Sequence, residues 1–330
     1  MTTVLDPFIL ALAAVIGFAV FLPATGAAVP VVDHATTIGI ALLFFMYGGR
    51  LPTDEFVDGL RHARLHLTVL ACTFVLFPLL GLLIHLATPM FLPPLMVAGL
   101  LFLTLLPSTV QSSVSFTSIA HGNVSASICA ATISNLLGVV ITPLWVLVAM
   151  GGTVTPSWAS VQSLVIQLIV PFILGQLLQR WVGPVLRRYK TYLTKVDRGV
   201  ILLVVYGAFS DDMRAHMWTQ VGLGPILLTL IVCAVLLTIV MFALAGATRL
   251  LRFNRADRLA IFFAGSKKSL TTGLPMAAVL FGPKQVGILV IPVMMFHQLQ
   301  LIVCAQLARR WSRDPVPEAP DDRVAVTAGQ

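Results

Sequence analysis

The chain has 330 residues, of which 58% are hydrophobic and 10% are charged, and its mean hydropathy is +0.96. These charged residues are too few to cover the surface of a soluble protein of this length. The composition therefore predicts an integral membrane protein that crosses the bilayer several times. A nucleic-acid partner is not expected, because the net charge of +8 comes from loops between apolar stretches rather than from a basic folded face.

Apolar stretches follow one another along the chain, and about 20 residues of helix suffice to cross a ~30 Å hydrocarbon core. We therefore predict an all-α protein with ten transmembrane helices. In chain order the predicted stretches are 7–22, 35–49, 65–87, 92–120, 123–150, 161–182, 196–209, 221–250, 259–281 and 286–307.

The basic residues gather in alternate loops, whereas the opposite loops contain only Arg214 and Lys284. Because Lys and Arg are retained on the cytoplasmic side, both termini are predicted to be cytoplasmic and the protein to lie in the plasma (inner) membrane. Residues 1–310 are predicted to form a single transmembrane unit, and 311–330 a disordered cytoplasmic tail. The four cysteines show neither CxxC nor metal-ligand spacing, so no metal site is predicted.

Weak matches between the two halves indicate an internal repeat, residues 1–152 and 153–310. The matches are Tyr47 and Gly48 with Tyr206 and Gly207, Ser112 and Ser113 with Thr271 and Thr272, and 138–143 with 287–292. Five helices per half would insert the second copy upside down. Such inverted repeats are typical of secondary transporters, which bind their substrate at the repeat interface.

Equivalent helices, the fourth and the ninth, contain helix-breaking residues in their middles. Proline removes a backbone donor and glycine tolerates unwinding. The predicted breaks are at Pro107 in the fourth helix and at Gly265, Gly273 and Pro275 in the ninth. Two discontinuous helices that cross at mid-membrane predict a binding site, because unwound backbone there must be satisfied by protein or a wet cavity. The alternative is a pair of kinked structural helices.

Two lysines, Lys267 and Lys268, interrupt the otherwise uncharged stretch 259–281. A charge in hydrocarbon costs about 2.5–3.5 kcal/mol, which indicates a functional position. Lys268 lies roughly 16 Å from Asp257 at the helical rise of ~1.5 Å per residue, close to mid-membrane. Both are candidate substrate- or ion-binding residues. We expect Lys268 to face the site and Lys267 to point elsewhere and extend its four-carbon stem toward the surface.

Every Asp and Glu falls in a loop, a terminus or at the edge of a predicted helix, so the lysines have no protein counter-ion at depth. Three explanations stay open: the amine is uncharged, hydroxyls and carbonyls solvate it, or an anionic substrate supplies the charge. The second includes a purely structural lysine at a helix break.

Further polar residues are expected near the same place. They are Ser108, Thr109, Gln111, Ser112 and Ser113 in the fourth helix, Ser127, Thr132, Ser134 and Asn135 in the fifth, and Ser269, Thr271 and Thr272 in the ninth. Each could instead bond its own helix. His297, Gln298 and Gln300 form a second polar cluster, in which His297 is either a hydrogen-bond partner between helices or a proton relay.

These motifs resemble the bile acid:sodium symporter superfamily, and in particular its SBF-like branch, which includes bacterial relatives of the seventh human bile-acid carrier. The resemblance rests on the segments 106–114, 120–124, 135–143, 171–176 and 265–275. It implies a ten-helix fold in which helices four and nine cross. It also implies a core domain of helices 3–5 and 8–10 and a panel domain of helices 1, 2, 6 and 7.

In sodium-coupled members, the resemblance implies cation sites with an intramembrane Glu and a Gln and Asn pair in the ninth helix. The corresponding segment here, 266–271, has none of these, although Ser127 matches a ligand position in the fifth helix and Ala131 replaces another hydroxyl. A lysine ammonium could take the place of a bound sodium ion. A sodium ion or a proton is the candidate coupling ion, and no other cofactor is expected.

The leading hypothesis is a secondary-active carrier of a small organic anion that works by alternating access within the lipid bilayer. The alternative is a regulatory or scaffold membrane protein that keeps the carrier fold without transport. An enzyme is not expected, because the predicted helices contain no paired carboxylates and no HExxH motif.

Overall fold

The computed structural model describes residues 7–50, 62–150, 165–214, 222–281 and 283–313, and the regular structure within these ranges is helical. The helices are α1 (Pro7–Phe21), α2 (Ala28–Arg50), α4 (Ala63–Ala71), α5 (Phe77–Ala87), α6 (Pro94–Leu105), α7 (Val110–Ile119), α8 (Val124–Ala149), α10 (Val170–Leu177), α11 (Gln179–Arg188), α12 (Lys190–Arg214), α13 (Leu223–Leu250), α14 (Arg255–Gly265), α15 (Leu270–Phe281) and α16 (Pro283–Trp311). Short π-helical segments, Cys72–Leu76 and Val165–Ile169, lead into α5 and α10.

Several helices are long and apolar, as expected of an integral membrane protein. Five described spans are long and apolar enough to cross a bilayer, and seven are if each of two sharply bent helix pairs counts as one span. Helical residues lie within each of the ten predicted stretches. The number of ten crossings itself stays a prediction.

Three helices extend beyond their predicted stretches. Helix α2 begins at Ala28, α12 covers Lys190–Arg214 and α16 covers Pro283–Trp311, whereas the apolar stretches suggested 35–49, 196–209 and 286–307. Polar and charged residues near the helix ends shortened the apolar signal. Near the start of the predicted stretch in α12, Asp197 forms an ion pair with Arg50 at the end of α2, with 2.6 Å between Nη1 and Oδ2. This pair links α12 to α2.

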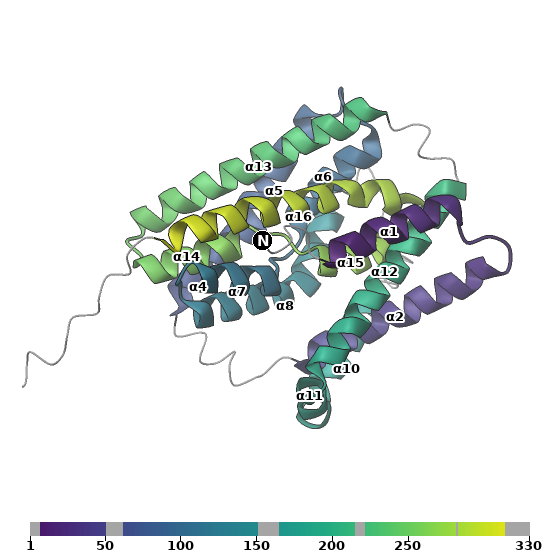
Figure 1. Cartoon of the computed structure of the whole chain (residues 1–330), viewed down its shortest axis with the longest axis horizontal. Coiled ribbons are helices and arrows are strands. Elements are labelled where there is room, and N and C mark those ends of the chain that lie inside the picture. Colours follow the sequence, from purple (N-terminus) through teal and green to yellow (C-terminus); the bar gives the residue numbers. More distant parts are fainter. Residues whose placement is uncertain (1–6, 51–61, 151–164, 215–221, 282, 314–330) are drawn as a thin grey trace, which may run out of the picture.

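Helices α1, α2, α10, α11 and α12 form one group at one side of the molecule, and α4–α8 with α13–α16 form a second group, in which α15 lies against α12 (Figure 1). Within the first group, α2 and α10 approach very closely: a Cβ on Gly48 would lie 2.0 Å from the Phe172 carbonyl oxygen, and one on Gly175 would lie 2.0 Å from that of Phe45. Small residues at such contacts let membrane helices pack backbone to backbone. Helix α12 contacts α15 and α16, so the two groups meet along it.

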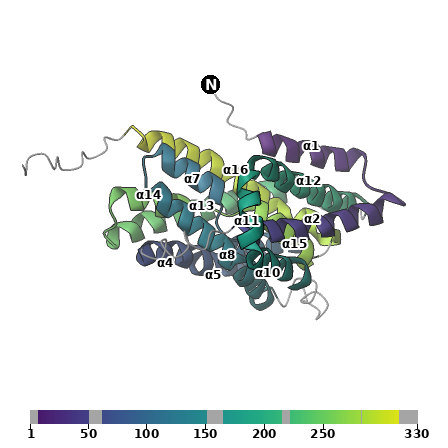
Figure 2. The same cartoon turned by 90° about the horizontal axis from the view of Figure 1, so that it is seen from below.

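In the second group, α7, α8 and α14 lie next to one another (Figure 2). Two similar turns lead into α8 and α14, with positive φ at His121 (58°) and Arg252 (54°). Asn123 caps α8 and Asn254 caps α14 with their side-chain oxygens. Both also donate to the Asp257 carboxylate, at 2.7 and 2.8 Å. The Asp257 carboxylate therefore links the α7–α8 turn to the start of α14.

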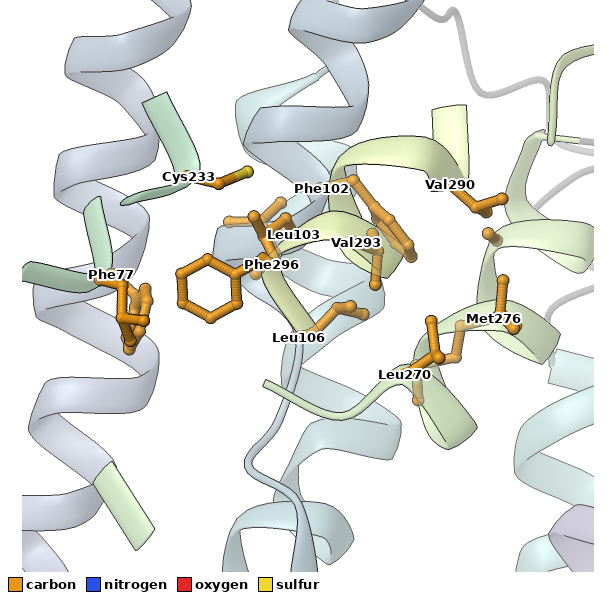
Figure 3. Packing of buried hydrophobic residues seen from close by; sticks show 14 of the residues in the cluster. Phe77, Phe102, Leu103, Leu106, Cys233, Leu270, Met276, Val290, Val293 and Phe296 are labelled. Carbon is orange, nitrogen blue, oxygen red and sulfur yellow. The ribbon is translucent and has the colours of Figure 1, made fainter. Parts of the chain in front are cut away.

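Aromatic side chains fill the interior beside α6 and α16. The rings of Phe77 and Phe296 are 6.0 Å apart, and those of Phe102 and Phe281 are 5.2 Å apart, both edge to face. Figure 3 shows Leu106, from the chain that follows α6, among these side chains. The core thus reaches up to the interruptions that form the candidate site.

Candidate functional site

The first interruption separates α6 from α7. Helix α6 ends at Leu105, α7 begins at Val110, and the two are bent by 60°. Leu106 is extended (ψ 153°), as a residue before proline must be. Pro107 packs on α8 at Gly138, where an added Cβ would lie 2.6 Å from the proline Cβ. The predicted break at Pro107 is confirmed.

The second interruption covers residues 266–269, between α14 and α15. Gly265 is the last residue of α14, but Gly273 and Pro275 lie inside α15, so their prediction as break positions was wrong. Gly273 is there for close packing, because a Cβ on it would lie 2.5 Å from Leu106 Cδ1. Pro275 lacks only one backbone donor, and the helix continues through it.

The two interruptions contact each other directly. The Ser269 amide donates to the Pro107 carbonyl at 2.8 Å. In the other direction, the Ser108 hydroxyl donates to the Ala264 carbonyl at 2.5 Å. The Ser113 hydroxyl lies 3.0 Å from the Phe263 carbonyl oxygen and 2.5 Å from that of Thr109 in its own helix, and its proton is shared between them. Carbonyls at the end of α14, which have no partner in their own helix, are thus satisfied by hydroxyls from the first interruption and α7.

Lys268 lies in the second interruption and is 1% exposed. Its ammonium donates hydrogen bonds of 2.9, 2.8 and 2.7 Å to the carbonyl oxygens of Thr73, Thr104 and Leu106. The nitrogen also lies 4.1 Å from the centre of the Phe77 ring. A lysine ammonium has three donors, so all of its hydrogen-bonding capacity is used.

These three carbonyls are available for a structural reason. In the π-helical segment the Phe77 amide bonds to the Cys72 carbonyl, five residues back, which leaves the Thr73 carbonyl without its usual helical partner. Thr104 and Leu106 are at the carboxyl end of α6, where carbonyls are also unpaired and the helix dipole is negative. A cation is therefore stabilised where the three carbonyls converge.

Gln300 of α16 holds the backbone of Lys268. Its Oε1 accepts from the Lys268 amide at 2.8 Å, and its Nε2 donates to the Lys268 carbonyl at 2.9 Å. The same Nε2 lies 2.9 Å from His297 Nδ1. The sequence analysis placed Gln300 in a separate polar cluster with His297 and Gln298. It did not predict that the Gln300 side chain bonds the backbone of Lys268. Gln298, the third member, is half-buried.

Lys267, the neighbouring lysine, is fully buried. Its Nζ lies 3.9 Å from the centre of the Phe116 ring and 5.6 Å from that of Phe263. Among the described residues this nitrogen has no hydrogen-bond partner. The expectation that Lys267 extends to the surface was wrong, because aromatic faces attract its ammonium within the protein.

A chain of side-chain hydrogen bonds joins α8 to both interruptions. Asn135 donates to the Ser108 carbonyl at 2.5 Å and accepts from the Thr272 hydroxyl at 2.9 Å. The Ser269 hydroxyl donates to Thr272 at 2.9 Å, and the Ser108 amide donates to Ser134 at 3.0 Å. The structure therefore brings together several residues that the sequence singled out.

The other candidates differ in exposure. Ser112, Thr132 and Thr271 are partly exposed and Gln111 is exposed, whereas Ser113 is buried in the contact between the interruptions. Ser112 donates weakly to Thr109 at 3.4 Å, and Thr271 lies 3.2 Å from Ser269 between their hydroxyls. Ser127 is buried and accepts from Thr117 at 3.1 Å, away from the interruptions.

Within the described ranges, neither Lys267 nor Lys268 forms an ion pair. The site therefore contains two buried amines of different kinds. One has all its donors on backbone carbonyls, and the other faces aromatic rings with its donors unused. The second arrangement leaves hydrogen-bonding capacity for an anion.

Comparison with known proteins shows a match to the SBF-like CPA transporter family over residues 6–313. An uncharacterised protein of Pseudomonas aeruginosa is 46% identical, over 98% of this chain and 96% of the relative. YfeH of Escherichia coli, named a candidate symporter, is 46% identical over 94% of each chain. Sodium/bile acid cotransporter 7 of Danio rerio is 29% identical over 90% of each.

Proposed function

Because the chain belongs to the SBF-like CPA transporter family, we propose that it is a secondary-active carrier of a small organic anion rather than an enzyme. The names of two relatives support transport: one is a sodium/bile acid cotransporter and the other a candidate symporter. The substrate class rests on the buried amines and on the scarcity of acidic residues in the apolar stretches.

The proposed architecture has ten transmembrane helices in two inverted repeats, 1–152 and 153–310, with both termini on the cytoplasmic side of the inner membrane. We assign the group of α1, α2 and α10–α12 to the panel domain, and the group of α4–α8 and α13–α16 to the core domain, that the resemblance implies. Alternating access would then move α1, α2 and α10–α12 against α4–α8 and α13–α16. The cytoplasmic tail proposed for residues 311–330 falls mostly outside the described residues, and α16 ends at Trp311.

We assign the anion contact to Lys267, because its buried ammonium has no hydrogen-bond partner among the described residues. This observation carries the proposal. Lys268, which the sequence favoured for this role, has all three donors on carbonyls. Lys268 would instead act as a tethered cation, whose ammonium satisfies the converging carbonyls of Thr73, Thr104 and Leu106. Gln111, Ser112, Thr132, Asn135 and Thr271 are the partly or fully exposed polar groups that could contact the rest of the anion.

Sodium is not expected to drive transport through this position, since the Lys268 ammonium already occupies the group of carbonyls that would attract a cation. A proton gradient is the alternative driving force. The coupling ion therefore forms part of the proposal and is tested with the substrate.

The test is uptake into proteoliposomes, with radiolabelled cholate as the first probe and other carboxylates in competition. We expect accumulation without a sodium gradient, and its loss in Lys267→Met. The matched control is Lys195→Met, which removes an exposed lysine from α12. Wild-type uptake by Lys267→Met would reject the assigned contact. If folded wild-type protein transports none of the anions under any gradient, the carrier hypothesis is rejected in favour of a regulatory or scaffold membrane protein.

A further inference from the structure

Helix α11 is bent by 94° from the helical segment Ile166–Leu177 that precedes it. Figure 1 shows it at one end of α10, turned away from the direction of the long helices. One side of α11 packs on the end of α2, where Leu186 and Gly183 are buried near Gly49. The rest of its surface faces outward.

That outward surface has two unlike sides. Leu178, Trp181, Val185 and Tyr189 are spaced by three or four residues and share one side, with exposures of 39%, 68%, 53% and 48%. Arg180, Arg187 and Arg188 have a seven- and eight-residue spacing and share the adjacent side, where all three are exposed. A helix with an apolar side beside a basic side fits the boundary between acyl chains and headgroups.

Aromatic and basic residues continue into the first turns of α12. Tyr192 is 67% exposed, and the Lys195 ammonium lies 5.8 Å from its ring. Tyr and Trp are enriched at this level of a bilayer. The single acidic residue between 177 and 198 is Asp197, and its carboxylate is paired with Arg50. The basic side of α11 therefore has no acidic neighbour in sequence to neutralise it.

We propose that α11 lies along the membrane surface and binds the headgroups of anionic phospholipids through Arg180, Arg187 and Arg188. The exposed apolar side enters the outer part of the acyl chains, and the three guanidinium groups face the phosphates. Arg suits this role because its planar donors match phosphate oxygens. Since α11 also packs on α2, bound lipid would hold the α1, α2 and α10–α12 group at a fixed depth in the bilayer.

The test measures thermal unfolding of the full-length protein in a zwitterionic detergent. Added phosphatidylglycerol should raise the melting temperature by several degrees, while phosphatidylcholine and inorganic phosphate should not. High salt should reduce the rise, because it screens exposed charges. The triple variant R180Q/R187Q/R188Q should melt like wild type without lipid and lose at least half of the lipid-dependent rise.

A matched control is R249Q/R309Q/R310Q, which removes the same charge from exposed positions on α13 and α16. It should keep the full rise. The proposal is overturned if the α11 variant keeps the rise, or if both variants lose it equally, which would indicate a general charge effect. An equal rise with inorganic phosphate would instead assign the site to a free anion.

Discussion

The two helix interruptions that meet at the site are built from opposite chemistry. The first, between α6 and α7, is made by Pro107 and presents carbonyls, of which Leu106 and Pro107 both accept bonds from the second. The second, between α14 and α15, contains no proline and presents donors, the Ser269 amide and the Lys268 ammonium. Each interruption thus supplies partners for the other, and Gln300, Ser134 and Asn135 bond further backbone groups of both.

The two lysines differ in the same way. Lys268 forms part of the contact between the interruptions, so we expect it to stabilise the fold. Lys267 lies outside this contact, among aromatic rings. Four pairs of matched variants test the contact between the interruptions and the separate role of Lys267.

Lys268→Met should cause the largest loss of stability. It leaves three buried carbonyls without a partner, and each such group costs about 1–3 kcal/mol, so we expect destabilisation of about 4 kcal/mol. Unfolding by sodium dodecyl sulfate in mixed micelles measures it. Lys267→Met is the control and should stay within about 1 kcal/mol of wild type, because the amine has no hydrogen bond to lose. Equal losses in both variants would abolish the distinction between the lysines.

Gln300→Leu should destabilise the protein by about 3 kcal/mol, because it removes the partners of both the amide and the carbonyl of Lys268. The same unfolding assay applies. Gln298→Leu, on the same helix, is the comparison, since its Oε1 makes no hydrogen bond within the described residues. A smaller effect at position 300 than at 298 would show that Gln300 does not clamp the interruption.

Gly138→Ala should cost about 2 kcal/mol, because the new methyl group would overlap Pro107 and push the first interruption off α8. Its matched control is Gly246→Ala in α13, where nothing lies within 4 Å of an added Cβ. There the change should be neutral or slightly stabilising, as alanine favours helix. Thermal unfolding of both variants decides whether Pro107 needs this contact.

Ser113→Ala should have the smallest effect, about 1 kcal/mol, because it removes a hydroxyl whose single proton is shared between the Phe263 carbonyl and the Thr109 carbonyl of its own helix. Ser115→Ala removes a hydroxyl that bonds only to the Gln111 carbonyl on its own helix, and its effect should be close to zero. A difference between these two serines in melting temperature would sharpen the view that α7 hydroxyls join the interruptions.

Several features of the site were predictable from the sequence because they follow from single residues. A proline such as Pro107 removes a backbone hydrogen bond from a helix, which indicates a break. Two adjacent lysines inside the apolar stretch 259–281 are costly to bury, which indicates a functional position. The pairing of Asn135 with Thr272 was not predicted as a bond, but both residues were already candidates on the polar content of their helices alone.

Other features depend on backbone geometry that residue types do not encode. Nothing in the sequence indicates that the segment Cys72–Leu76 is π-helical, so the Thr73 carbonyl could not be identified as a partner of Lys268. The orientation of each lysine also depends on which carbonyls and rings surround it. The same limit explains the errors at Gly273 and Pro275, where composition indicated unwinding but packing against Leu106 explains the glycine.

The π-helical turn has a consequence for how this chain can change. Such a turn contains one residue more than a regular turn, so deleting a single amino acid from Cys72–Leu76 would restore ordinary winding while α5 keeps nearly the same face toward its neighbours. After deletion of Val75, the residue four positions beyond Thr73 would be Pro78, which has no N–H to donate. The Thr73 carbonyl would therefore still lack a helical donor and would remain available to the Lys268 ammonium. A one-codon deletion in this turn should thus be tolerated better than loss of the lysine.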